Sequence, residues 1–184
     1  MKKILSLSLL LFLIVAVVAL IALKPTADVQ EEQSDDTAQV VKDRVEAIYD
    51  EVFGCYLSSA DAISECDFDT REFLAEDYWA TYETVTKVEE DGEMGFFESD
   101  HWIQGQDWDS DLALTVDSVQ MISPERALVY IRITNFGNME RCALEMSCEG
   151  NQWLIDDFIT FAPERISEKE QMKQYIAEAE QKDE

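Results

Sequence analysis

Basic residues are scarce in this chain. Its 184 residues include 14 lysines and arginines against 40 aspartates and glutamates, for a formal net charge of −26. Proteins that bind nucleic acid need clustered lysine and arginine to contact the phosphates. We therefore expect no nucleic-acid partner and no docking onto anionic lipid headgroups. The same charge favours a basic protein or peptide as partner, because opposite charges steer association.

Signatures of metal, nucleotide and nucleophilic chemistry are also missing. The chain has one histidine, His101, and has no CxxC pair, no glycine-rich phosphate loop and no GxSxG element. A zinc site would need more cysteine and histidine ligands at short spacing. The acidic segment 107–111 opens like a calcium loop, but Leu112 and Ser118 stand where that loop needs glycine and glutamate. We predict no metal and no cofactor.

The longest hydrophobic run lies at the N-terminus. Residues 4–23 are apolar except for Ser6 and Ser8, and about 20 helical residues span roughly 30 Å, the thickness of a hydrocarbon core. Lys2 and Lys3 precede the run, so the positive-inside rule places the N-terminus in the cytoplasm. Residues 1–24 are predicted to be a single-pass anchor, or uncleaved signal, of the inner (cytoplasmic) membrane, with the domain in the periplasm or outside. The alternative is cleavage as a signal peptide, leaving a secreted or periplasmic protein.

An acidic linker and a helix are predicted to follow the anchor. Residues 25–38 are polar and acidic with one proline, which is typical of a flexible spacer. Over residues 39–53 the apolar positions follow helical spacing. Asp36 or Thr37 can cap the start of this helix, and Gly54 can close its end.

Two further helices are indicated by their capping residues. One is predicted to begin at Asp69, with Glu72 three residues later, and to end at the turn signal of residues 91–92. The other is an acidic C-terminal helix within residues 163–184, where Ser167 starts a capping box and a narrow apolar stripe follows. Packing of this last helix on its own domain and docking to a partner are both open.

The hydrophobic period changes to alternation after residue 111. Four strands are predicted, and their short turns imply an antiparallel meander. In the first strand the phase shifts after Val116, which indicates a bulge. Helices followed by a sheet predict an α+β domain over residues 39–162, with a curved four-stranded sheet wrapped around the helices as a cone.

Three segments carry a resemblance to a known family. They are residues 73–78, residues 100–109 (DHWIQGQDWD) and residues 152–158 (QWLIDDF). With the order of elements, they resemble the bacterial cell-envelope family called domain of unknown function 3828, within the nuclear transport factor 2-like (NTF2-like, or cystatin-like) superfamily. The resemblance covers roughly residues 40–161. It implies the cone fold and an envelope location, and no established activity.

A ligand pocket inside the cone is the candidate site. Asp156 and Asp157 are neighbours on the last strand, so one of them is expected to point inward. Such a buried carboxylate either meets hydrogen-bond donors or acquires a raised pKa, as in isomerases of this fold. The predicted pocket residues are Tyr78, Trp79, Trp102, Asp107 and Asp157.

The four cysteines fall into two pairs. Cys55 and Cys66 flank one helix end and can approach each other, so they are the disulfide candidates in an exported domain. Cys142 and Cys148 are six residues apart on one strand, about 20 Å, which is too far for a disulfide. We expect these two to be thiols.

Two classes of function fit these features. The first is a non-catalytic, membrane-anchored module outside the cytoplasm that binds a protein or peptide, and an immunity or inhibitor protein against a basic toxin is one version of it. The second is a small-molecule binder or an isomerase- or hydrolase-like enzyme using the cone pocket. Inward-pointing aspartates with convergent polar groups would favour the second.

Overall fold

The structure, a computed structural model, describes residues 27–58, 70–89, 95–161 and 163–182. The chain divides into two units, Met1–Asp35 and Asp36–Glu184, and the second carries the fold described below. The predicted anchor, residues 1–24, lies outside the described residues. Among the helices that the structure describes, none is long and apolar enough to cross a membrane.

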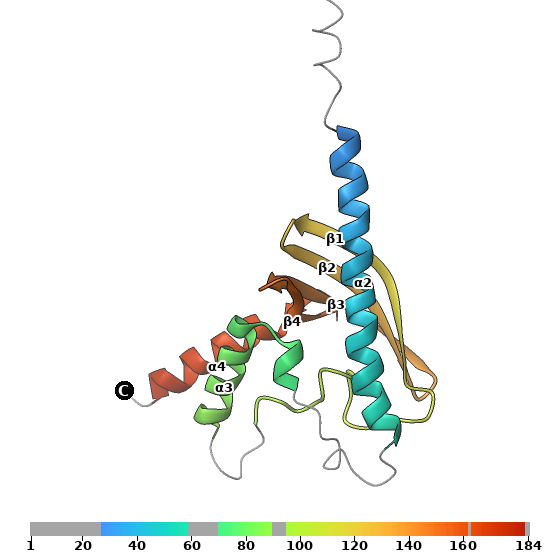
Figure 1. The fold of residues 1–184 in the computed structure, drawn as a ribbon. Coiled ribbons are helices and arrows are strands. Elements are labelled where there is room, and N and C mark those ends of the chain that lie inside the picture. Colours follow the sequence, from blue (N-terminus) through green and yellow to red (C-terminus); the bar gives the residue numbers. More distant parts are fainter. Residues whose placement is uncertain (1–26, 59–69, 90–94, 162, 183–184) are drawn as a thin grey trace, which may run out of the picture. The chain divides into compact units, whose positions relative to one another are not determined.

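The second unit combines helices with one antiparallel sheet, so the α+β prediction is confirmed (Figure 1). The sheet order is β1-β2-β3-β4-β5. In chain order the elements are α2 (Ala27–Ser58), η2 (Thr70–Phe73), α3 (Glu76–Val88), β1 (Ala113–Ser123), β2 (Arg126–Asn135), β3 (Asn138–Glu149), β4 (Gln152–Phe161), β5 (Arg165–Ser167) and α4 (Glu168–Lys182). The prediction of four strands is wrong, because the sheet has a fifth, short strand, β5. This strand has three residues, too few to display an alternating pattern.

The long strands follow the sequence pattern closely. The pairing of β1 with β2 shifts register between Val116 and Ser118, which confirms the predicted bulge. The β2–β3 hairpin turns at Phe136 and Gly137, both with positive φ. Asp111 stabilises this turn, because its carboxylate accepts hydrogen bonds from the backbone N–H groups of both turn residues, at 2.9 and 2.6 Å.

Helix α2 is longer at both ends than predicted. It begins at Ala27 instead of Asp36 or Thr37, so residues 27–38 of the predicted linker are helical. No proline or glycine interrupts that stretch, and its glutamates and glutamines are good helix formers. The helix also continues through Gly54 to Ser58. Gly54 is exposed there, and a glycine inside a helix costs only about 1 kcal/mol, which tertiary packing overrides.

The second predicted helix is interrupted. Residues from Thr70 form the short 3₁₀ helix η2, and α3 begins only at Glu76. Between them Leu74 forms a bridge with Ile155 of β4, and Ala75 N–H donates to the Ile155 carbonyl at 2.8 Å. A pairing with a strand some 80 residues later in the chain leaves no signal in the local sequence.

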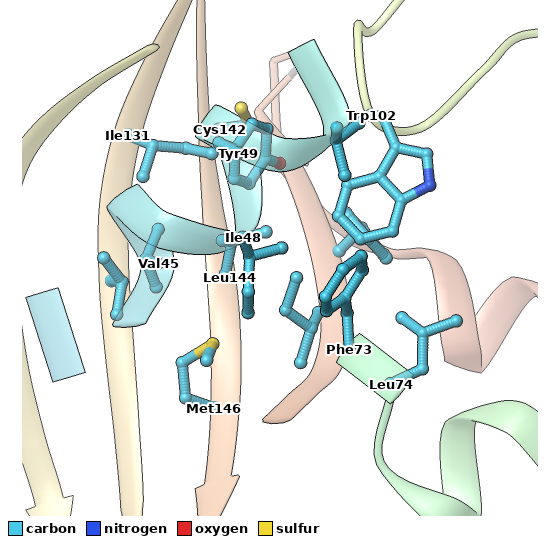
Figure 2. Close-up of a cluster of buried hydrophobic side chains, with 14 of the residues drawn as sticks. Val45, Ile48, Tyr49, Phe73, Leu74, Trp102, Ile131, Cys142, Leu144 and Met146 are labelled. Atoms are coloured by element: carbon cyan, nitrogen blue, oxygen red, sulfur yellow. The ribbon is translucent and has the colours of Figure 1, made fainter. Parts of the chain in front are cut away.

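The core lies between α2 and the sheet. Val45, Ile48 and Tyr49 of α2 are at most 1% exposed. Figure 2 shows them packed with residues of β2, β3, the η2 region and the segment before β1, namely Ile131, Cys142, Leu144, Met146, Phe73, Leu74 and Trp102. The alternating pattern therefore places the apolar face of the sheet against the helical stripe, as binary patterning requires.

Helix α4 packs on its own unit. Ser167 Oγ accepts the Glu170 backbone N–H at 3.0 Å, which confirms the predicted cap. Met172 is fully buried, and Tyr175 packs against Phe96 with ring centroids 5.6 Å apart. Figure 1 shows α4 beside α3, in agreement with their contacts. The reading of α4 as a helix packed on its own domain is therefore confirmed.

Candidate functional site

A cavity of about 490 Å³ opens beside the core, within the size range of small-ligand sites. Its lining comes from the end of α2, from η2 and its flank, from α3 and from the segment before β1. The described lining residues are Tyr56, Thr70, Leu74, Trp79, Tyr82, Phe97, Glu98, Ser99, Asp100, His101, Trp102 and Gln106. None of these is lysine or arginine. We call this space the aromatic cavity.

Stacked rings form one wall of the aromatic cavity. Trp79 and Tyr82 lie three residues apart on α3, which places them on the same helix face, and their ring centroids are 5.4 Å apart. Phe97 continues the row at 4.8 Å from Tyr82. Phe97 is held there because the neighbouring Phe96 N–H donates to the Glu89 carboxylate at 2.6 Å.

Asp100 supplies a carboxylate to the aromatic cavity. It is half-buried, and it accepts hydrogen bonds from the Tyr56 hydroxyl and from the Trp102 backbone N–H, the latter at 2.7 Å. Burial and the hydrogen bond to Asp100 raise the pKa of Tyr56 far above its ordinary value, so this phenol remains a donor. In the described part of the chain no lysine or arginine pairs with Asp100. Among the residues that the structure describes, only neutral donors contact this carboxylate.

His101 lines both the aromatic cavity and a second cavity of about 280 Å³, as do residues 97–99. Its Nδ1 lies 3.1 Å from Glu168 Oε1, and its ring stacks on Phe158 with centroids 4.2 Å apart. A carboxylate only accepts, so Nδ1 donates in this contact, and in the neutral form of the imidazole Nε2 is then the acceptor nitrogen. A carboxylate that orients an imidazole in this way is also found in catalytic bases.

The structure brings together only part of the predicted pocket. Trp79 and Trp102 both line the aromatic cavity. Tyr78 is fully buried, and its hydroxyl lies 3.5 Å from His101 Nδ1. Asp107 is exposed and accepts the Trp108 backbone N–H at 2.9 Å, and neither it nor Asp157 is in the lining of either cavity.

Asp156 and Asp157 do not point to opposite faces, and that expectation is wrong. A register shift in β3–β4 pairing falls between Glu145 and Met146, whose partners are Asp157 and Ile155, so Asp156 is the extra residue of a bulge. Both carboxylates contact the start of α4. Asp157 accepts from Ser167 Oγ and from Lys169 N–H, and Asp156 accepts from Lys169 Nζ at 2.7 Å.

The Asp157 carboxylate has a structural role at the start of α4. Burial raises its pKa, and the hydrogen bonds from Ser167 and Lys169 oppose that rise. Asp156 is also paired with Arg126 at 2.9 Å. The donors that satisfy these aspartates are therefore on β2, β5 and α4.

The acidic segment 107–111 forms hydrogen bonds with other residues of this unit. Asp109 accepts the Ser110 N–H at 2.6 Å, and Asn135 links the segment to β2 by accepting from Asp109 N–H and donating to the Asp107 carbonyl. Within the described residues, no group of three or more potential metal ligands is clustered.

The structure shows the oxidation state of three of the four cysteines. Cys55 is disulfide-bonded, and Cys142 and Cys148 are free thiols, as expected for the latter two. Cys66, the predicted partner of Cys55, lies outside the described residues. Burial raises the pKa of Cys142 to about 12, so this thiol is an inert core residue.

Sequence reasoning did not assign Tyr56, Tyr82, Phe97 and Asp100 to the site. Asp100 lies in an irregular segment, where side-chain direction follows no period from which it can be predicted. Comparisons with protein families, with curated proteins and with solved structures found no match to this chain.

Proposed function

We propose that the chain is a membrane-anchored, non-catalytic module outside the cytoplasm that binds a basic protein or peptide. One observation carries the proposal: the aromatic cavity contains Asp100 and Glu98 but no lysine or arginine among its described lining residues. The net charge of −26 extends the same preference to the molecule as a whole, since a negative field raises the association rate of cationic partners.

The location outside the cytoplasm is supported by the N-terminal run and by cysteine chemistry. Residues 4–23 have the length and flanking charge of an anchor of the inner membrane. Cys55 is disulfide-bonded, and such bonds persist in oxidising compartments. Both features fit a domain held beyond the cytoplasmic membrane.

We further propose that this unit is an NTF2-like domain of the family called domain of unknown function 3828. The support is the order of elements, since helices precede a long antiparallel meander and α2 packs on its apolar face. An immunity protein against a basic toxin is one form that such a binding module could take.

An enzyme using the same cavity is the second candidate. The His101–Glu168 pair is the observation in its favour, because Nε2 of an imidazole oriented by a carboxylate can act as a base. Hydrolysis of p-nitrophenyl acetate that the wild type shows and His101→Gln lacks would favour this candidate over the binding module.

Binding of a basic peptide to the full-length chain in detergent tests the proposed function. A tetra-arginine peptide is expected to bind at about 50 mM salt and to weaken strongly at about 500 mM, because salt screens exposed charges. A tetra-glutamate peptide is the control and should not bind. Equal binding of the two peptides, or binding of neither, would contradict the proposal.

A further inference from the structure

We propose that the aromatic cavity recognises one cationic side-chain group, an alkyl guanidinium or ammonium, and that Asp100 is its counter-ion. This inference rests on the proposed function and names the group that the site takes. Asp100, together with the stacked rings beside it, forms a pocket suited to a charged head on an apolar stem.

The first support for this inference is the set of hydrogen-bond donors around the Asp100 carboxylate. Its two oxygens accept from a phenol and a backbone N–H, which are neutral donors and leave the charge uncompensated. Charges removed from water are ordinarily paired with opposite charges. Glu145 and Asp156 follow that rule, since both are paired with arginine or lysine. Asp157 and Glu89, like Asp100, accept hydrogen bonds from neutral donors, but of these three carboxylates it is Asp100 that lines the aromatic cavity.

The second support is the wall of stacked aromatic rings in the aromatic cavity. Trp79 already has the Arg71 guanidinium over its ring, 5.6 Å from the centroid, and Tyr82 stacked at 5.4 Å. The stack therefore offers a ligand mainly apolar surface, while the charge is supplied separately by Asp100. Lysine and arginine have this division, because their methylene stems pack on apolar surface and their heads remain polar.

The remaining lining fits a peptide around such a side chain. Ser99 and Gln106 are exposed polar residues of the lining, and they can bond backbone groups on either side of the bound residue. A volume of about 490 Å³ exceeds a single side chain and accommodates that residue with its adjoining backbone.

The test compares arginine with its neutral isostere. Binding of the peptides Ac-Ala-Ala-Arg-Ala-Ala-NH2 and Ac-Ala-Ala-citrulline-Ala-Ala-NH2 to the full-length chain in detergent is measured by isothermal titration. We expect the arginine peptide to bind at least about tenfold more tightly, because a charge-assisted hydrogen bond to a carboxylate is lost in citrulline. Asp100→Asn should abolish this preference.

Two further variants make the result independent of folding defects. Asp50→Asn removes the same charge from an exposed position on α2, and it should keep the preference for arginine. Ser99→Lys leaves the Asp100 hydrogen bonds intact and places a cation in the lining, so it should weaken the arginine peptide about tenfold. Far-UV circular dichroism of each variant checks that the fold is retained.

The source of the cation is distinguished by agmatine, a free alkyl guanidinium. Displacement of the arginine peptide by agmatine supports recognition of the guanidinium itself. Agmatine affinity equal to that of the peptide identifies a free small cation as the ligand, and tighter binding of the peptide identifies a peptide.

Two results would overturn the inference. Equal affinity for the arginine and citrulline peptides would do so, and so would a preference for arginine that survives in Asp100→Asn. If tetra-arginine still binds in a salt-dependent way in either case, the proposed function stands and only its assignment to Asp100 fails. Absence of binding to every basic peptide would remove both.

Discussion

Trp79 and Trp108 differ in whether the indole N–H has a hydrogen-bond acceptor. Trp108 Nε1 donates to the Tyr56 carbonyl at 3.0 Å, whereas Trp79 Nε1 is buried with no acceptor among the described residues. A buried donor without a partner costs about 1–3 kcal/mol, and a satisfied one contributes about 1 kcal/mol. Two tryptophans of similar exposure therefore have opposite polar contributions to stability.

The same substitution at both positions measures this difference. Trp108→Phe should lower the free energy of unfolding by about 2–4 kcal/mol more than Trp79→Phe, because the first change removes a hydrogen bond and the second removes a buried donor without a partner. Each change removes the same atoms, so the two variants are matched controls for lost packing. Urea unfolding followed by circular dichroism provides the measurement, and equal or reversed costs would show that the Trp79 nitrogen has a partner.

At the residue scale the sequence predicts the character of the site better than its members. Large aromatics such as Trp79 and Trp102 were assigned to a pocket, and both line the aromatic cavity. Asp107 and Asp157 were assigned with them but bind backbone groups elsewhere. The sequence shows that acidic residues are available to line a pocket. Which carboxylate lines the cavity depends on the backbone geometry, and only the folded structure shows that geometry.

Lys169 connects three elements of the fold. Its Nζ lies 2.7 Å from Asp156 of β4 and 3.0 Å from Asp77 of α3, while its own residue is in the first turn of α4. Its side chain is 13% exposed and that of Asp156 is 6% exposed. The hydrogen bond from Lys169 holds the pKa of Asp77 below its ordinary value.

Removal of this cation should destabilise the unit. Lys169→Met is expected to lower the free energy of unfolding by about 3 kcal/mol, because Asp156 stays buried with only half-exposed Arg126 as a partner. Lys173→Met is the control. Lys173 also contacts Asp77, but it is 52% exposed, so its loss should cost less than about 0.5 kcal/mol. Similar costs for the two variants would contradict this role of Lys169.

The same variant should change the acid response. Because the folded pKa of Asp77 is lowered, its stabilising contribution is present above the ordinary value of 3.8 and is lost as the pH falls through the folded pKa. The wild type should therefore lose stability below about pH 4 more steeply than Lys169→Met. The measurement is the urea midpoint as a function of pH.

At the element scale periodicity predicts the strands and misplaces the helix ends. Strand β2 has buried residues at alternate positions, as the sequence indicates, and the bulge after Val116 of β1 is visible in the sequence as a phase shift. Helix starts failed at α2 and α3, because good helix formers extended the first and the Leu74–Ile155 bridge interrupted the second. The bulge at Asp156 also changes the directions in which the Asp156 and Asp157 side chains point relative to a regular strand.

At the scale of the whole molecule, charge and the N-terminal run support the proposed class of protein, while the cavity cannot be predicted from the sequence. Tyr56, Trp79 and Phe97 come from separate elements, and only tertiary packing makes them neighbours. The net charge of −26 and the hydrophobic residues 4–23 are properties of the chain alone. They support a location and a type of partner, and the site requires the fold.

Intact-mass spectrometry of the full-length protein, extracted from washed native membranes, tests the location and the binding role together. We predict an uncleaved N-terminal segment, two alkylatable thiols among the four cysteines, and a basic protein or peptide that co-purifies at low salt. Recovery of the uncleaved chain from the cytosolic fraction, with all four thiols reduced and no basic companion, would contradict an anchored module outside the cytoplasm.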